Sequence, residues 1–453
     1  LVNADFIDNS AGVDCSDHEV NLKILLGLAE RRGELDRPAR DELLVEVTDH
    51  VVEHVLYDSF LQAQILSEEV VVSKGRLYAY EDLMASLESA GLLARESERL
   101  PGSEEIAERR RSGRGLERPE LALLLAYSKR ALARELLASD FCEDPWLEGD
   151  LRAYFPDPVI ERFGHLLAEH PLRRELIAMV NANMVVNSLG PTFASQLAAE
   201  RGAEPADVTR AFRVAREVTG ADARWDAVEG LPRATDRAVV TELMVGVDRL
   251  VEATARWYLH HDGGAQLEDQ IEAGAAPFAQ LIAVLPEIGS DEWRANRRQI
   301  ADGLVAQGVP EDVAWSHALT TELMLGPDIV SVAEQTGRPV EAVAQAFHAL
   351  AVRLDVVWLL GALDDLPQTT RTLRWAVQAV REDCLAALAA LARSALLEAP
   401  AGQEAPAAVE AYLDARAPRC RRLAAVTASL TVEGTGDLPA LMLAVRAVRA
   451  LAD

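Results

Sequence analysis

The chain has 453 residues, of which 49% are hydrophobic, and it carries a formal net charge of −28. This composition supplies a sizeable core and excludes a chain that is disordered throughout. Because so acidic a surface repels phosphate groups, the charge also argues against nucleic-acid and anionic-membrane partners.

Cysteines and apolar runs bear on the compartment. The four cysteines are scattered and form no C-x-x-C pair, which is typical of a reduced, cytoplasmic protein. No apolar run approaches the roughly 18 residues that a membrane span requires. We therefore expect a cytoplasmic protein.

From about residue 20 onward the pattern is helical, with apolar residues at three- and four-residue spacing. One long helix is predicted over 41–66 and a second over 77–93. Strand signals are confined to the extreme N-terminus. The sequence therefore predicts a mainly α fold.

Residues 99–118 interrupt this pattern with Pro, Gly, Ser and clustered charge, and they predict a linker. The arginine run at 109–115 could bind RNA, but the acidic remainder favours a solvated loop. Pro119 and Glu120 then suit the first turn of a new helix.

Two segments further along resemble each other. The string at 189–212 is similar to that at 325–347, and each is followed by a Trp, a Leu-Pro pair and a long helical pattern. This similarity predicts pseudo-repeat units near 189–260 and 325–397, built by internal duplication of a helical unit. Duplication alone assigns no chemistry.

The opening string "NSAGVDCSDHE", residues 9–19, is the most specific motif. It resembles the loop N-A-G-G-V-x-V-S of glutamate-type amino-acid dehydrogenases, in which a Glu follows the Ser by three residues. Asn9, Gly12, Val13, Ser16 and Glu19 fall in register. Several later strings also resemble the large NAD-specific glutamate dehydrogenases, so we expect the C-terminal portion of such an enzyme.

This resemblance implies a reaction in amino-acid catabolism, the oxidative deamination of L-glutamate by NAD to 2-oxoglutarate and ammonia. It implies that Ser16 binds the side-chain carboxylate of the substrate and that Val13 touches its methylenes. Asn9 and Gly12 would shape the loop beside the nicotinamide. Ala11 departs from the family's first Gly, which leaves the loop geometry open there.

A purely structural interpretation of the same residues is a capping box. Ser16 and Glu19 have the S-x-x-E spacing ahead of an apolar run, so they would satisfy the free N–H groups of a helix that begins there. The two interpretations are compatible, since a helix N-terminus also attracts an anionic substrate.

The family's catalytic lysine lies in a Gly-rich stretch, and none of Lys23, Lys74 and Lys129 has that context. No G-x-G-x-x-G occurs either, so no dinucleotide fold is predicted. We therefore expect no catalytic residue and no NAD-binding domain in this chain, and no turnover by the chain alone.

Two alternatives remain at this point. The string "HVVEH" at 50–54 matches an inverted metallopeptidase motif, with His50 and His54 as ligands and Glu53 as base. No third ligand is evident, and we predict no metal. The other alternative is a stand-alone helical scaffold or oligomerisation module.

The sequence thus predicts three parts. Residues 1–98 would end the catalytic region, with the substrate loop plus helices, and 99–118 would be a linker. Residues 119–453 would be an all-helical C-terminal domain for assembly or regulation, within a homo-oligomer.

Overall fold

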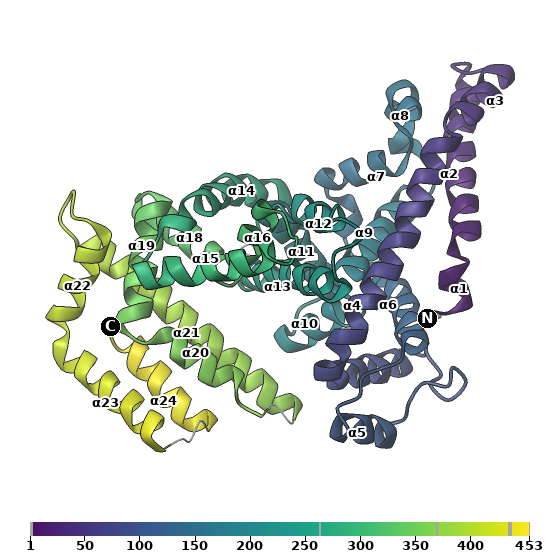
Figure 1. Ribbon diagram of the computed structural model, residues 1–453. Helices are drawn as coiled ribbons and strands as arrows, with labels where there is room; N and C mark the ends of the chain where they lie inside the picture. The colour runs from purple at the N-terminus through teal and green to yellow at the C-terminus, as the bar shows by residue number, and fades with distance from the viewer. Residues whose placement is uncertain (1–2, 262–263, 368–369, 434–436, 453) are drawn as a thin grey trace. The chain divides into compact units, whose positions relative to one another are not determined.

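The computed structural model describes residues 3–261, 264–367, 370–433 and 437–452 (Figure 1). Every regular element within these ranges is a helix, so the prediction of a mainly α fold is confirmed. The prediction of strand at the extreme N-terminus was wrong. The N–H groups of Ile7 and Asp8 donate to the Ala4 carbonyl there and close a helical turn. The predicted domain ends at residues 1 and 453 lie outside the described residues.

The chain divides into two compact units, and the first contains residues 1–214 and 259–269. Its elements, with η marking 3₁₀-helices, are α1 (Asp5–Asp8), α2 (Ser10–Arg32), α3 (Arg37–Glu46), α4 (Thr48–Ser89), α5 (Ser103–Arg111), α6 (Arg118–Ala138), η1 (Phe141–Glu143), η2 (Pro145–Leu147), α7 (Glu148–Tyr154), α8 (Asp157–Phe163), η3 (Gly164–Glu169), α9 (Arg173–Leu189), α10 (Phe193–Arg201) and most of α11 (Pro205–Thr219).

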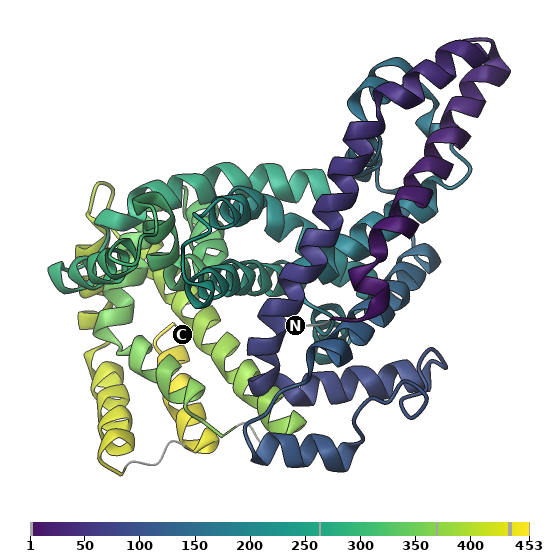
Figure 2. The ribbon, with the colours of Figure 1, turned by 45° about the vertical axis from the view of Figure 1, so that its right-hand side comes forward.

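Helices α2 and α4 lie side by side in this unit, with α3 at one end of the pair (Figure 2). Gly33 ends α2 in the left-handed conformation that favours glycine, with φ of 74°. Helix α4 bends at Arg76, whose φ of −119° is not helical. The single helix predicted over 41–66 is divided at Val47 between α3 and α4. The helix predicted over 77–93 is confirmed as far as Ser89, where α4 ends.

The predicted linker at 99–118 contains helix α5, which the sequence interpretation missed. Arg109 is buried there and donates to Glu105 at 2.6 Å and to Glu120 at 2.6 and 2.8 Å. Two carboxylates therefore hold the first arginine of the run inside the fold. As predicted, α6 carries Pro119 and Glu120 in its first turn, where Glu120 completes a capping box with Glu117.

The second unit contains residues 215–258 and 270–453. Its elements are α12 (Ala221–Glu229), most of α13 (Arg237–His261) and of α14 (Leu267–Val284), η4 (Leu285–Glu287), α15 (Asp291–Val305), α16 (Glu311–Ala318), α17 (Thr320–Leu323), α18 (Gly326–Thr336), α19 (Val340–Arg353), α20 (Val356–Asp364), α21 (Arg371–Glu398), α22 (Ala405–Ala415), α23 (Ala417–Glu433) and α24 (Leu438–Arg449).

One hydrophobic cluster of this unit joins α12, α13, α15 and α16. Its buried members include Leu243, Leu304 and Val313. The segments predicted as pseudo-repeats hold α10 to α13 and α18 to α21, which follow one another in the same order. Their origin by duplication stays a prediction.

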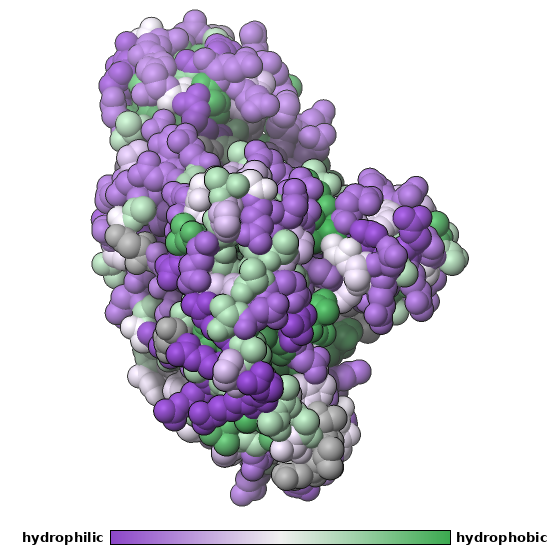
Figure 3. Space-filling view, turned by 90° about the vertical axis from the view of Figure 1, so that its left-hand side faces the viewer, coloured by the Kyte–Doolittle hydropathy of each residue, from purple (hydrophilic) through white to green (hydrophobic). Residues whose placement is uncertain are grey.

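The surface and the helix lengths bear on the predicted partners. The face drawn in Figure 3 is largely hydrophilic, with hydrophobic residues in small scattered groups. Within the described ranges, no single helix is long and apolar enough to cross a bilayer. Only two sharply bent helix pairs reach that composition jointly, Leu267–Glu287 with Asp291–Val305 and Val340–Arg353 with Val356–Asp364.

Candidate functional site

The residues singled out by the opening motif lie on the first turns of α2, which begins at Ser10. Asn9, Gly12, Val13 and Ser16 are spaced i, i+3, i+4 and i+7, so they follow one face of the helix. All four are exposed, and Val13 keeps 66% of its surface accessible. The predicted substrate loop is therefore an exposed helical stripe, which we call the outer face of α2.

The expected capping box at Ser16 is wrong. Because α2 starts six residues earlier, the backbone N–H groups near Ser16 already have helical partners. The Ser16 hydroxyl donates instead to the Val13 carbonyl at 3.0 Å, and Glu19 pairs with Lys23. The departure at Ala11 causes no strain, since a residue inside a helix needs no positive φ.

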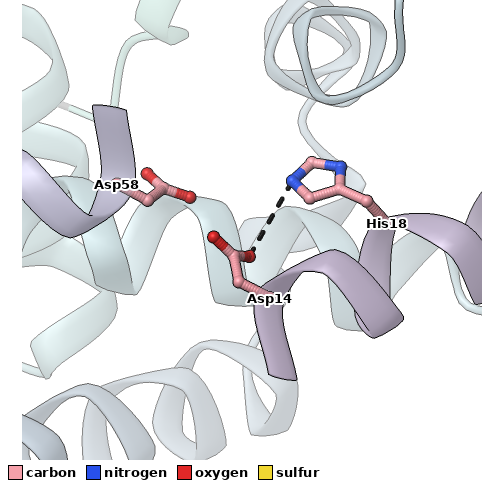
Figure 4. A group of neighbouring side chains, drawn as sticks. All are labelled: Asp14, His18 and Asp58. Atoms are coloured by element: carbon pink, nitrogen blue, oxygen red, sulfur yellow. Dashed lines mark ion pairs between the residues drawn. The ribbon is translucent and has the colours of Figure 1, made fainter. Parts of the chain in front are cut away.

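The opposite face of α2, the inner face, carries a polar cluster that the sequence interpretation missed. Asp14 and His18 from α2 meet Asp58 from α4 (Figure 4). The His18 Nε2 lies 3.9 Å from an Asp14 carboxylate oxygen. One nitrogen or oxygen atom from each of the three side chains lies within 4.8 Å of the others.

Aromatic and amide groups surround His18, which is 3% exposed. Its ring stacks on Tyr154 with 4.3 Å between centroids, and the His54 ring meets it edge-on at 5.7 Å. Asn21 donates to the Tyr154 hydroxyl at 3.2 Å. Helices α2, α4 and α7 are therefore tied together through this one imidazole.

Burial sets the charge state of the carboxylates in the cluster. It raises the pKa of Asp14 to about 6, helped by the negative charges of Asp58 and Asp17. Burial also raises the pKa of Asp58. Lys129 of α6 faces both: burial lowers the pKa of its ammonium to about 8, while Asp58 and Asp14 oppose that shift. Two carboxylates with raised pKa values and one ammonium with a lowered pKa thus influence one another electrostatically.

The pKa of the His18 imidazole is shifted in the opposite direction to those of the carboxylates. Burial, followed by the neighbouring His54, lowers the pKa of His18 to about 4. His18 is therefore neutral near pH 7.

Asp14, His18 and Asp58 are also the donor types that hold a divalent cation. The ammonium of Lys129 interacts electrostatically with both carboxylates. The residues of the "HVVEH" motif do not form a metal-binding group with a third ligand anywhere in the described ranges. That the chain holds no metal stays a prediction.

The three lysines have distinct settings. Lys23 is exposed and pairs with Glu19, and Lys74 is exposed on α4. Lys129 is half-buried within the polar cluster. A sequence signal for it existed, because Lys129 interrupts the apolar stripe of Leu125 and Leu132 on α6.

Comparison with known proteins adds an independent result. Residues 113–450 match the family described as "Glutamate dehydrogenase, C-terminal", and residues 1–69 match "Bacterial NAD-glutamate dehydrogenase, catalytic domain".

Three curated relatives are each described as an NAD-specific glutamate dehydrogenase. The protein of Halomonas elongata is 35% identical over 79% of this chain and 22% of its own length. The protein of Pseudomonas aeruginosa is 33% identical over 96% of this chain and 27% of its own length. The protein of Mycobacterium tuberculosis is 31% identical over 99% of this chain and 28% of its own length. The chain thus spans 22–28% of the length of the relatives it matches. Because one family match alone covers residues 113–450, this chain belongs to the glutamate dehydrogenase family of these NAD-specific enzymes.

Proposed function

We propose that this chain is the C-terminal portion of a longer enzyme that oxidises L-glutamate with NAD, giving 2-oxoglutarate and ammonia. The observation that carries the proposal is the outer face of α2. Four residues to which the family resemblance gives ligand roles form one exposed stripe there. A stripe of this kind suits contact with a substrate and with a neighbouring part of the enzyme.

Ser16 is the proposed contact for the side-chain carboxylate of glutamate. Its hydroxyl donates to the Val13 carbonyl, and a charged carboxylate is a stronger acceptor than a backbone carbonyl. Val13, which is exposed beside it, would contact the substrate methylenes. The role of Ser16 requires its hydroxyl to rotate away from the Val13 carbonyl.

Asn9 and Gly12 are the proposed neighbours of the nicotinamide. A Cβ at Gly12 would meet no described atom within 4 Å beyond the neighbouring backbone of its own helix, so packing inside the described structure does not require glycine. A ligand or domain that approaches the backbone closely would require it.

The inner face of α2 is proposed to hold the outer face in place. The stacking of His18 on Tyr154 and its edge-on contact with His54 fix the helix against α7 and α4. A rigid helix is a better platform for substrate contacts than a loop, because its side chains keep their positions.

NAD itself is proposed to bind outside this chain. Dinucleotide-binding folds are built on a parallel sheet, and the described residues form helices without such a sheet. This helical structure supports the placement of NAD outside the chain, and we place the catalytic lysine outside it as well. The remaining residues, about 119–453, would serve assembly or regulation of a cytoplasmic homo-oligomer.

The test compares the complete gene product with this chain. The complete product should form NADH from NAD and L-glutamate, whereas the purified chain should not. A complete product without this activity would overturn the proposal. NADH formation by the chain alone would overturn the placement of the catalytic lysine and the NAD site.

A further inference from the structure

A second candidate site lies wholly within the second unit. A pocket of about 310 Å³ opens between α12, α13 and α16. This volume is at the small end of the range typical of ligand sites, roughly 300–1,000 Å³. The residue that sets its chemistry is Arg224 of α12, a half-buried arginine on the pocket wall.

Arg224 makes two hydrogen bonds, and both go to uncharged acceptors. Its Nε donates to the Thr219 carbonyl at 3.0 Å, and its Nη1 donates to the Ser316 hydroxyl. Throughout the described ranges, no carboxylate lies within ion-pair distance of this guanidinium. Burial lowers the pKa of Arg224, and no neighbouring acid opposes that effect.

Arg297 shows how the same unit treats a buried arginine that has only a structural role. Its Nε and Nη2 each lie 2.6 Å from a carboxylate oxygen of Glu322, and its Nη1 donates to the carbonyls of Leu285 and Ile288. A buried guanidinium without such a partner is costly. The missing partner of Arg224 is therefore the feature that a ligand would supply.

Other polar groups of the pocket can join Arg224. The Ser316 hydroxyl accepts a hydrogen bond from Arg224, so its own hydrogen remains available to a ligand acceptor. Burial lowers the pKa of His317, which also lines the pocket and is neutral near pH 7. Asp312 is exposed at the pocket and would repel a ligand with several negative charges.

Most of the remaining wall is apolar. Seven apolar side chains line it, Ala223, Ala227, Val228, Leu243, Val247, Ile282 and Val313, and Thr219, Gly220 and Thr320 complete the lining. A bare inorganic anion would leave these groups without contacts, whereas a short hydrocarbon chain would cover them.

We infer that this pocket binds a small organic monoanion, with its carboxylate held by Arg224 and Ser316 and a short aliphatic body against the apolar wall. The site goes beyond the proposed glutamate chemistry, and its residues belong to a different unit from the outer face of α2. Binding can be measured without turnover, so a failure here is distinguishable from a failure of the proposed function.

The first experiment titrates the purified chain by calorimetry with three probes: butanoate, butanamide and inorganic phosphate. Butanoate and butanamide share one body and differ in charge. Butanoate should bind at least about tenfold more tightly than either of the others, since a hydrogen bond to a charged group is worth more than a neutral one. Equal binding of butanoate and butanamide would overturn the inference, and so would tighter binding of phosphate.

The second experiment changes the site. Arg224→Gln should weaken butanoate binding by at least about tenfold. Arg298→Gln, which makes the same charge change at an exposed position of the same unit, should leave it unchanged. Unchanged binding in Arg224→Gln would contradict the inference.

Circular dichroism and thermal melting report whether Arg224→Gln still folds. If it does not, Ala227→Leu decides, because it fills the pocket from the exposed side and keeps Arg224. Loss of butanoate binding in a folded Ala227→Leu variant supports the site, and retained binding overturns it.

Discussion

The two faces of α2 differ in what their polar side chains contact. On the inner face, Asp14 and His18 meet Asp58 and Tyr154 and are at least partly buried. On the outer face, Asn9 and Ser16 are exposed, and the Ser16 hydroxyl reaches only its own helix backbone. This difference shows that a polar residue on a helix does not by itself indicate a ligand site. Changes on the inner face should alter stability, and changes on the outer face should alter substrate binding.

The largest effect is expected from His18→Ala. Removing the buried ring leaves a cavity beside Tyr154, and we expect the chain to lose about 2–4 kcal/mol of unfolding free energy. Urea denaturation near neutral pH measures the loss. The exposed His165 provides the control, because His165→Ala should change stability by less than about 0.5 kcal/mol. Equal losses of unfolding free energy in the two variants would show that the buried His18 ring does not stabilise the fold.

Measuring stability as a function of pH tests the burial of His18 in a second way. The pKa of His18 is about 4 in the folded chain and 6.5 in its ordinary state. The unfolded chain therefore binds more protons between these values, so this contribution to stability is lost as the pH falls from 6.5 towards 4. His18→Phe keeps an aromatic ring but has no titrating group. As the pH falls from 6.5 to 4, its unfolding free energy should decrease by about 2 kcal/mol less than that of the wild type. Parallel pH profiles would contradict this.

Asp14→Asn should have a smaller effect of opposite sign. The folded pKa of about 6 exceeds the ordinary 3.8, so the folded chain binds more protons in between and loses stability as the pH rises through this interval. The amide of Asp14→Asn carries no charge and so removes the cost of burying an ionised carboxylate. We expect the unfolding free energy to rise by about 1–2 kcal/mol near pH 7, and this gain should disappear below about pH 4. Denaturation at both pH values tests it, and a less stable variant near pH 7 would show that the carboxylate is needed as an ion.

The smallest effect on stability belongs to the outer face. Gly12 lies within α2, and a methyl group there would meet no described atom within 4 Å beyond the neighbouring backbone of the helix. Gly12→Ala should therefore raise the unfolding free energy of the chain by about 0.5 kcal/mol, the usual helix preference for alanine. The same change should reduce NADH formation by the complete enzyme. A variant that is both more stable and fully active would show that nothing approaches this position.

Local signals in the sequence located much of the fold. The apolar periodicity predicted helix over most of 41–66 and 77–93, although not the break at Val47 or the helix end at Ser89. Pro119 with Glu120 predicted the start of α6. The same kind of signal failed at Ser16 and Glu19. The helix there begins at Ser10 because its inner face, with Leu22 and Leu25, packs against the rest of the unit. Tertiary packing thus overrode a local capping pattern.

The polar cluster depended on contacts that no local pattern contains. Asp58 and Lys129 reach Asp14 from helices far along the chain, and Tyr154 comes from a third. The same holds for α5, whose Arg109 donates to Glu120, eleven residues further along the chain. What the sequence does show is polar residues that interrupt apolar stripes, as Lys129 does on α6, and these mark positions to inspect.

The most direct test of the account is the Michaelis constant for L-glutamate of the complete enzyme carrying Ser16→Ala. If Ser16 on the outer face binds the substrate carboxylate, this constant should rise by at least about tenfold while the melting temperature stays the same, since a lost hydrogen bond to a charged group weakens binding to that extent. An unchanged constant for glutamate would contradict the assignment of the outer face of α2 to the substrate.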